Sequence, residues 1–221
     1  DRPLRRLSAE HPLYWCHAKA QTVRYQQGTG RFYEGPPTLE GVDIGCRTAV
    51  IFTPIDLSNG WYGQMPPNNY APGHWVVMDD ARKLGMNITS YILANLQYGR
   101  SFPLTQVEFR QAKSVGQALS IGRLIHGGDW DPNPSALPRL QKYLAEHSTL
   151  EVDFKRTAVD PADAAVFQFP VLYMVGHEDF VLGDKQVVNL RQYLTQGGVL
   201  VAEACCGRKE FDLAFRREIR R

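Results

Sequence analysis

The chain has 221 residues, of which 43% are hydrophobic and 22% are charged, as in an ordinary globular domain. A formal net charge of +2 with scattered basic residues argues against a nucleic-acid partner, which would need a basic face or stripe. No apolar run approaches the roughly 20 residues that cross a bilayer, so the sequence predicts no membrane span in this segment.

The first half of the chain predicts one strand-loop-helix unit. Residues 1–41 are rich in Pro, Gly, Arg and Gln and are expected to be mostly loop, and CRTAVIFTP (46–54) predicts a buried strand. A long, turn-rich aromatic loop follows over 55–75, and then a helix over 78–96. Residues 98–119 indicate a linker.

The second half alternates strands with helices. Its strands are mostly short, continuous apolar runs, which are typical of a parallel sheet covered on both faces. We therefore predict an α/β protein with a doubly wound, mostly parallel sheet and helices on both faces. The expected strands are 119–126, 150–156, 170–176 and 199–204, and the expected helices are 134–147, 183–198 and 208–221.

Two adjacent cysteines follow the last of these strands. In an open parallel sheet, ligands bind at the carboxyl ends of the strands. A thiol of Cys205 or Cys206 at a sharp strand-to-helix turn is a candidate nucleophile. His177 is the candidate base, and Glu203 or Asp179 would orient it.

The same corner has two other interpretations. A typical nucleophile turn has glycine on both sides, whereas EACCGR offers only Gly207, so both cysteines are alternatively small residues packed in a tight corner. A strained disulfide between Cys205 and Cys206 is a further alternative. The isolated Cys16 and Cys46 are expected to be small buried residues.

Other polar and aromatic residues also follow strand ends, and we predict that they bind a ligand. His126, Asp129 and Trp130 follow the first strand of the second half, and Asp179 and Phe180 follow the third. The alternative interpretation of that loop is that Asp129 and Asp131 accept backbone amides and cap the following helix, while Trp130 packs.

The loop over 55–75 adds Asp56 and Trp61 to the predicted ligand-binding residues. Its aromatic residues indicate a surface for a carbohydrate or peptide, or else a loop that packs against itself. The sequence contains neither a GxGxxG motif nor a P-loop, so we expect no nucleotide cofactor.

A metal site is not predicted. His126, Asp129, His177 and Asp179 offer mixed imidazole and carboxylate ligands, but on separate loops with no helix to fix their geometry. The four cysteines show no zinc-binding spacing.

Residues 121–221 resemble the bacterial family called domain of unknown function 4159. The resemblance lies in GGDWDPNPSALPRLQKYL (127–144), the stretch VLYMVGHEDF…VAEACCG (171–207) and FDLAFRREIRR (211–221). It implies a flavodoxin-like sheet similar to that of class I glutamine amidotransferases.

The first half resembles the later part of the same family, through LEGVDIGCRTAVIFTPIDLSNGW (39–61) and ARKLGMNITSYILANLQYG (81–99). The order of the parts is therefore permuted. The chain is interpreted either as a slice across a tandem pair or as a circular permutant, and we expect 1–97 and 120–221 to pack as one permuted domain.

From this resemblance we expect a non-catalytic binding or interaction module of a larger protein of the bacterial cell envelope or periplasm. Its partner would be a protein or carbohydrate, and the full-length protein would carry a second copy of the domain. The alternative is a thiol-dependent hydrolase or amidotransferase-like enzyme, and a weaker alternative is a metal-dependent hydrolase.

Overall fold

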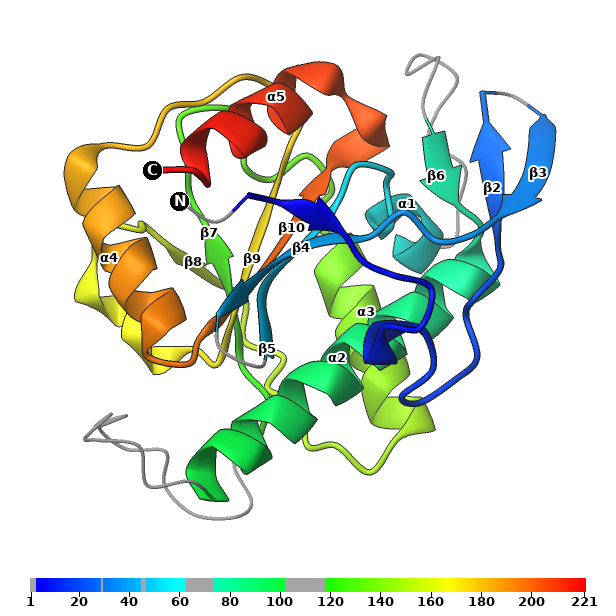
Figure 1. The fold of residues 1–221 in the computed structure, drawn as a ribbon, viewed down its shortest axis with the longest axis horizontal. Coiled ribbons are helices and arrows are strands. Elements are labelled where there is room, and N and C mark those ends of the chain that lie inside the picture. Colours follow the sequence, from blue (N-terminus) through cyan, green and yellow to red (C-terminus); the bar gives the residue numbers. More distant parts are fainter. Residues whose placement is uncertain (1–2, 29, 45–46, 63–73, 102–117) are drawn as a thin grey trace.

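The computed structural model describes residues 3–28, 30–44, 47–62, 74–101 and 118–221 (Figure 1). Ten strands and five α-helices lie in these ranges. The strands are β1 (Arg5–Arg6), β2 (Val23–Gln27), β3 (Arg31–Gly35), β4 (Glu40–Ile44), β5 (Arg47–Thr53), β6 (His74–Val76), β7 (Ile121–Leu124), β8 (Thr157–Val159), β9 (Val171–Gly176) and β10 (Val199–Ala204). The helices are α1 (Ser58–Tyr62), α2 (Met78–Ser101), α3 (Ala136–His147), α4 (Asp184–Thr195) and α5 (Lys209–Glu218).

The main sheet has seven strands in the order β1-β4-β5-β10-β9-β7-β8. The strands from β5 to β8 are parallel, and β4 and β1 add an antiparallel edge. A smaller sheet has the order β3-β2-β6. The protein is therefore an α/β protein with a mostly parallel central sheet, while the finer flavodoxin-like topology stays a prediction.

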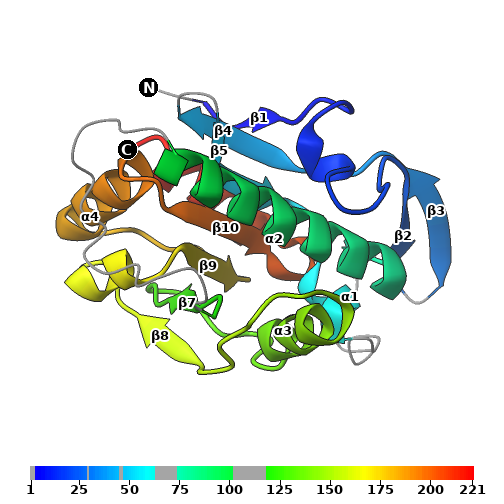
Figure 2. The ribbon, with the colours of Figure 1, turned by 90° about the horizontal axis from the view of Figure 1, so that it is seen from below.

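Helices pack on both faces of the main sheet because its central strands are apolar on both sides. Tyr173 of β9 and Val201 of β10 contribute to one apolar cluster together with α2 and α3. Their neighbours Leu172 and Leu200 contribute to a second cluster together with α4 and α5. Figures 1 and 2 show α2 along one face of the sheet and α4 with α5 on the other.

The two segments of the chain share one sheet. Strand β5 pairs in parallel with β10, so that Val50 lies opposite Leu200 and Thr53 opposite Glu203. This pairing brings the loop after β5 next to the end of β10. The permuted origin of this arrangement stays a prediction.

The strands and helices that were predicted from apolar patterns are confirmed, and most of them are shorter than predicted. The predicted strands over 46–54, 119–126, 170–176 and 199–204 correspond to β5, β7, β9 and β10. The predicted helices over 134–147, 183–198 and 208–221 correspond to α3, α4 and α5, and the one over 78–96 corresponds to α2, which continues to Ser101.

The polar stretches differ from the prediction in places. Residues 1–41 are mostly loop, as predicted, but they also hold β1, β2, β3, the start of β4 and a short helix, η1 (Pro12–Tyr14), which were not predicted. The strand predicted over 150–156 is reduced to one bridge at Val152, because Phe154 points to solvent and pairing with β7 begins at Thr157. The predicted loop over 55–75 contains α1 and the start of β6, and its residues 63–73 lie outside the described residues. Most of the predicted linker, residues 102–117, lies outside the described residues.

No helix in the described ranges combines the length and apolarity that a membrane crossing requires.

The turn between α4 and β10 gives a test of the packing. A methyl group on Gly198 would lie 2.2 Å from Cζ of Tyr193, whose hydroxyl is fixed by both backbone groups of Val199. We expect Gly198→Ala to lower the free energy of unfolding by about 2 kcal/mol, because the buried ring cannot move away.

Urea denaturation followed by circular dichroism measures this change. Gly127→Ala is the matched control, since a methyl group there meets no atom within 4 Å. Equal stability of the two variants would contradict the packing described.

Candidate functional site

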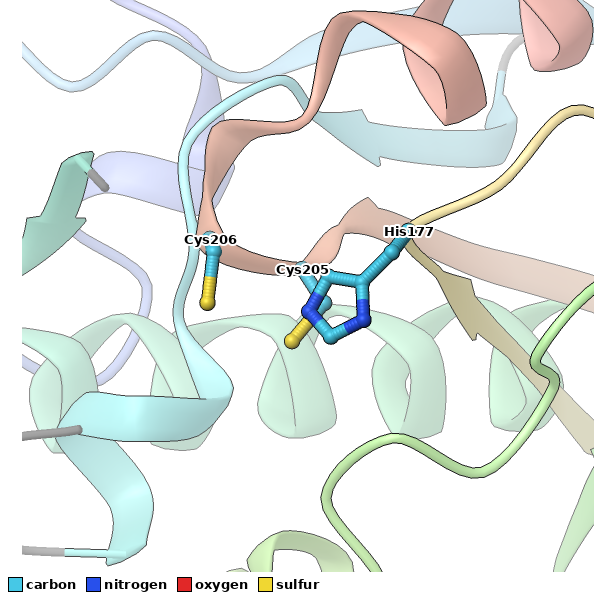
Figure 3. A group of neighbouring side chains, drawn as sticks. All are labelled: His177, Cys205 and Cys206. Carbon is cyan, nitrogen blue, oxygen red and sulfur yellow. The ribbon is translucent and has the colours of Figure 1, made fainter. Parts of the chain in front are cut away.

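The carboxyl ends of three neighbouring strands meet at one edge of the sheet. Asp56 follows β5, His177 follows β9, and Cys205 and Cys206 follow β10. Figure 3 shows the His177 ring beside the two cysteines, whose sulfur atoms extend to the same side of the corner. The imidazole and thiol donor atoms all lie within 4.8 Å of one another.

The corner after β10 has an unusual backbone. Cys206 adopts a left-handed conformation with φ 56° and ψ 14°, and no other non-glycine residue among those described has a positive φ. Gly207 follows with φ 66°, and the short helix η4 (Cys205–Gly207) leads into α5. A left-handed non-glycine residue costs about 1 kcal/mol, so the surrounding contacts must hold it in place.

The carboxylate of Asp56 stabilises this corner through hydrogen bonds. It is fully buried, and its Oδ2 accepts hydrogen bonds from the backbone N of Cys206 at 2.5 Å and from Sγ of Cys205 at 3.4 Å. Its Oδ1 accepts from the backbone N of Asn59 at 2.8 Å and from Ser58 Oγ at 3.1 Å. One side chain therefore joins the start of α1 to the thiol corner.

Asp129 fixes the imidazole of His177. Its Oδ2 lies 2.6 Å from Nδ1 of His177, and its Oδ1 accepts from the backbone N of His177 at 2.7 Å and of Glu178 at 3.2 Å. The loop that carries Asp129 is held in turn by ion pairs of Asp131 with Arg123 and Arg156. A carboxylate acceptor at Nδ1 implies that this nitrogen carries a proton, which leaves Nε2 for the thiols.

The two thiols differ in charge. The pKa of Cys206 is lowered to about 4, first by the hydrogen bond from Cys205 and then, against the opposing effect of burial, by the hydrogen bond and charge of His177. The pKa of Cys205 is raised well above its usual value by its hydrogen bond to Cys206 and by burial. Cys206 is thus the thiolate at neutral pH, and Cys205 keeps its single proton, which is shared between Asp56 Oδ2 and the Cys206 sulfur. Burial also works against protonation of His177, but contact with Cys206 and Asp129 outweighs it and raises the pKa of the imidazole.

A second buried carboxyl group lies behind the corner. Glu203 is fully buried, and its Oε2 accepts from the backbone N of Leu57 at 3.3 Å. Burial and the nearby charge of Asp56 raise the pKa of Glu203 to about 8, and burial with the charge of Cys206 raises the pKa of Asp56 to about 6. Glu203 is therefore mostly protonated at neutral pH, and it does not contact Asp129 or orient His177 through any contact described.

Two of the polar residues predicted for the site lie apart from the thiols. The ring nitrogens of His126 face the carbonyl oxygen of Val175 at 2.9 Å and the backbone N of Gly128 at 3.2 Å. Asp179 is exposed and pairs with Arg217 at 2.9 Å. Only Asp129 and His177 of the four metal-ligand candidates therefore contact each other.

The aromatic candidates are mostly core residues. Trp61 is 2% exposed and donates from Nε1 to the carbonyl oxygen of Ala81, and Phe180 packs against His126 and Phe211. Trp130 is half-buried in the loop beside Asp129. Trp61 and Phe180 are therefore not available to bind a ligand in this structure.

The prediction for Cys16 is wrong, because this residue is exposed. It follows η1 on the surface of α2, where its thiol donates to the carbonyl oxygen of Asn87 at 3.2 Å. Cys46 lies outside the described residues.

Asn59 also belongs to this site, although the sequence did not indicate it. Its Nδ2 donates to Asp56 Oδ2 at 2.9 Å and to Cys206 Sγ at 3.6 Å, and its Oδ1 accepts from Asn133 at 3.4 Å. The residue lies three positions after Asp56, on a helix where a loop was expected. That spacing, typical of an aspartate that caps a helix, was the available signal.

Comparison with known proteins gives a match for the second segment. Residues 120–221 match the model of the family described as "Domain of unknown function (DUF4159)". None of the curated proteins compared with the chain matches it. The matched segment contains His177, Cys205 and Cys206, whereas Asp56 and Asn59 lie outside it.

The charge difference between the thiols can be measured by iodoacetamide labelling against pH. We expect the labelling rate of Cys206 to change little between pH 5 and pH 8, because its pKa of about 4 keeps it a thiolate throughout. In Cys205→Ala the rate at pH 5 should fall relative to that at pH 8, because the hydrogen bond that contributes most to the low pKa is gone.

Fragment-ion mass spectrometry separates the two adjacent cysteines. Cys16 is the internal control, because burial of part of its side chain raises its pKa and its labelling should fall steeply with acid. Parallel pH profiles for Cys16 and Cys206 would contradict the assigned charges.

Glu203 makes stability depend on pH. Between its usual pKa of 4.5 and its raised pKa of about 8, the folded protein keeps a proton that the unfolded chain releases, so stability falls as pH rises through this range. We expect Glu203→Gln to raise the free energy of unfolding by about 2 kcal/mol at pH 8 and by much less at pH 5. The amide keeps an oxygen for the backbone N of Leu57.

Urea titrations at both pH values check this expectation. Glu178→Gln, which changes an exposed glutamate next to His177, is the control and should show no such pH dependence. A stability change of Glu203→Gln that is the same at pH 5 and pH 8 would rule out the assigned protonation.

Proposed function

We propose that the chain is a thiol-dependent hydrolase that acts on amides or esters. Cys206 is the nucleophile, His177 is the general acid and base, and Asp129 orients the imidazole. The observation that carries this proposal is the geometry of the corner: a left-handed Cys206 at a strand-to-helix turn, beside an imidazole whose other nitrogen is held by a carboxylate.

The reaction follows from these positions in two steps. The Cys206 thiolate attacks the carbonyl carbon to form a C–S bond, the C–N or C–O bond breaks, and the His177 imidazolium gives its proton to the leaving group. A water molecule then attacks the thioester while His177 takes its proton. The C–S bond breaks, the acid leaves, and Cys206 is again a thiolate.

The two cysteines support the proposal in different ways. Cys206 is the more exposed of the two, at 6% against 2% for Cys205, and it receives hydrogen bonds where Cys205 donates one. The thiol of Cys205 instead donates to Oδ2 of Asp56. Cys205 is buried directly before the proposed nucleophile, and Gly207 directly after it supplies the second left-handed residue.

The non-catalytic binding module and its cell-envelope setting stay predictions from the resemblance. The aromatic part of that prediction is weakened, because Trp61 lies in the core with its indole nitrogen bonded to Ala81. Asp56 has a role in a packed corner, but an imidazole that a carboxylate orients beside the thiols has no comparable role there, which favours the hydrolase.

Acylation by p-nitrophenyl acetate, followed by intact-protein mass spectrometry, tests the proposal. The native chain should gain one acetyl group at Cys206, and Cys206→Ala should gain none there. His177→Gln should slow acylation about tenfold at pH 5, because the imidazole no longer stabilises the thiolate of Cys206.

Cys16→Ala is the matched control and should be acylated like the native chain. Circular dichroism shows whether each variant keeps its fold. Acylation that is unchanged in correctly folded Cys206→Ala and His177→Gln would overturn the hydrolase.

A further inference from the structure

The donor atoms of His177, Cys205 and Cys206 form a compact group of three. They lie within 4.8 Å of one another, and no other set of three or more His, Cys, Asp or Glu side chains in the described ranges is grouped in this way. Two sulfurs and one imidazole nitrogen are donors that thiophilic metal ions prefer.

The spacing fits one ion. In a tetrahedral zinc site the Zn–S distance is about 2.3 Å and the Zn–N distance about 2.0 Å, so two donors of the same ion lie about 3.5 to 3.8 Å apart. The three donor atoms lie within 4.8 Å of one another, so side-chain rotations that move them by about 1 Å bring them around a common centre. The backbone at the ends of β9 and β10 can therefore keep its position when the ion binds.

The surrounding contacts are those of a supported metal site. Histidine ligands generally donate their other ring nitrogen to a carboxylate, which fixes the ring, and Asp129 Oδ2 lies 2.6 Å from Nδ1 of His177. Asn59 donates from Nδ2 to Sγ of Cys206 at 3.6 Å. Asp56 Oδ2 lies 3.4 Å from Sγ of Cys205 and accepts its thiol proton, which an ion would displace. Outer hydrogen bonds thus reach the His177 and Cys206 donors.

We propose that His177, Cys205 and Cys206 bind one thiophilic metal ion such as Zn²⁺, with a fourth position for water, and that the bound ion blocks the thiol nucleophile. Binding displaces two protons to the solvent, that of the Cys205 thiol and the Nε2 proton of the His177 imidazolium, and the ion takes up the lone pairs of the two sulfurs and of this nitrogen, so no electron transfer is involved. The metal site stands on the geometry alone, and only the block of catalysis rests on the proposed function.

Cobalt binding tests the site directly. The full chain, freed of metal by a chelator and kept reduced, is titrated with Co²⁺, and the expected result is a sulfur-to-cobalt charge-transfer band that saturates at one equivalent. Addition of Zn²⁺ should remove the band. Cys205→Ser, Cys206→Ser and His177→Gln should each weaken Co²⁺ binding at least about tenfold, as should Asp129→Asn through the orientation of the ring.

Cys16→Ser is the matched control and should bind Co²⁺ like the native chain. Circular dichroism of each metal-free variant separates loss of a ligand from loss of the fold. Absence of the band in the native chain, or a band that persists at full strength in Cys205→Ser, overturns the site.

The acylation assay separates this proposal from the hydrolase. In the metal-free chain, acylation of Cys206 without any cobalt band refutes the metal site and leaves the hydrolase in place. A cobalt band without acylation refutes the hydrolase and leaves the metal site. Where both occur, Zn²⁺ should prevent acylation at one equivalent, and unaffected acylation would overturn the proposed block.

Discussion

The carboxylate of Asp56 is the contact on which the site depends. It is fully buried, it accepts the backbone N of Cys206 at 2.5 Å, and it accepts the thiol of Cys205 at 3.4 Å. Without an acceptor there, the left-handed corner would leave a buried N–H unpaired, at a cost of about 1 to 3 kcal/mol. This one side chain thus stabilises the left-handed backbone of Cys206, on which both the proposed nucleophile and the proposed metal site depend.

The sequence predicted the parts of the fold that are buried on both sides. Strands β9 and β10 are continuous apolar runs. A short run of this kind is typical of a strand that is buried on both faces of a parallel sheet. The strands near the N-terminus were missed because they carry Arg, Gln, Glu and Gly, and every residue of β3 is exposed apart from the half-buried Gly35. Edge and surface strands are formed by pairing with their neighbours, which a local pattern does not record.

For the site, the sequence indicated the residue types but not the contacts. The rule that parallel strands end at a common edge selected His177, Cys205 and Cys206, which the structure places within 4.8 Å. The same rule selected His126, whose ring nitrogens face backbone groups instead. The direction of a side chain depends on its tertiary partners, and so does the contact of Asn59 with Cys206, which crosses between distant parts of the chain.

The pairing of β5 with β10 has a consequence for how this site can be inherited. The thiols and the imidazole belong to the segment that matches the family model, whereas Asp56 and Asn59 belong to the other segment. A recombination event that moved residues 120–221 alone into another gene would transfer the thiols and the imidazole without the carboxylate of Asp56. The recipient protein would have to supply its own buried acid at the neighbouring strand, so the two segments are expected to be retained or lost together during evolution.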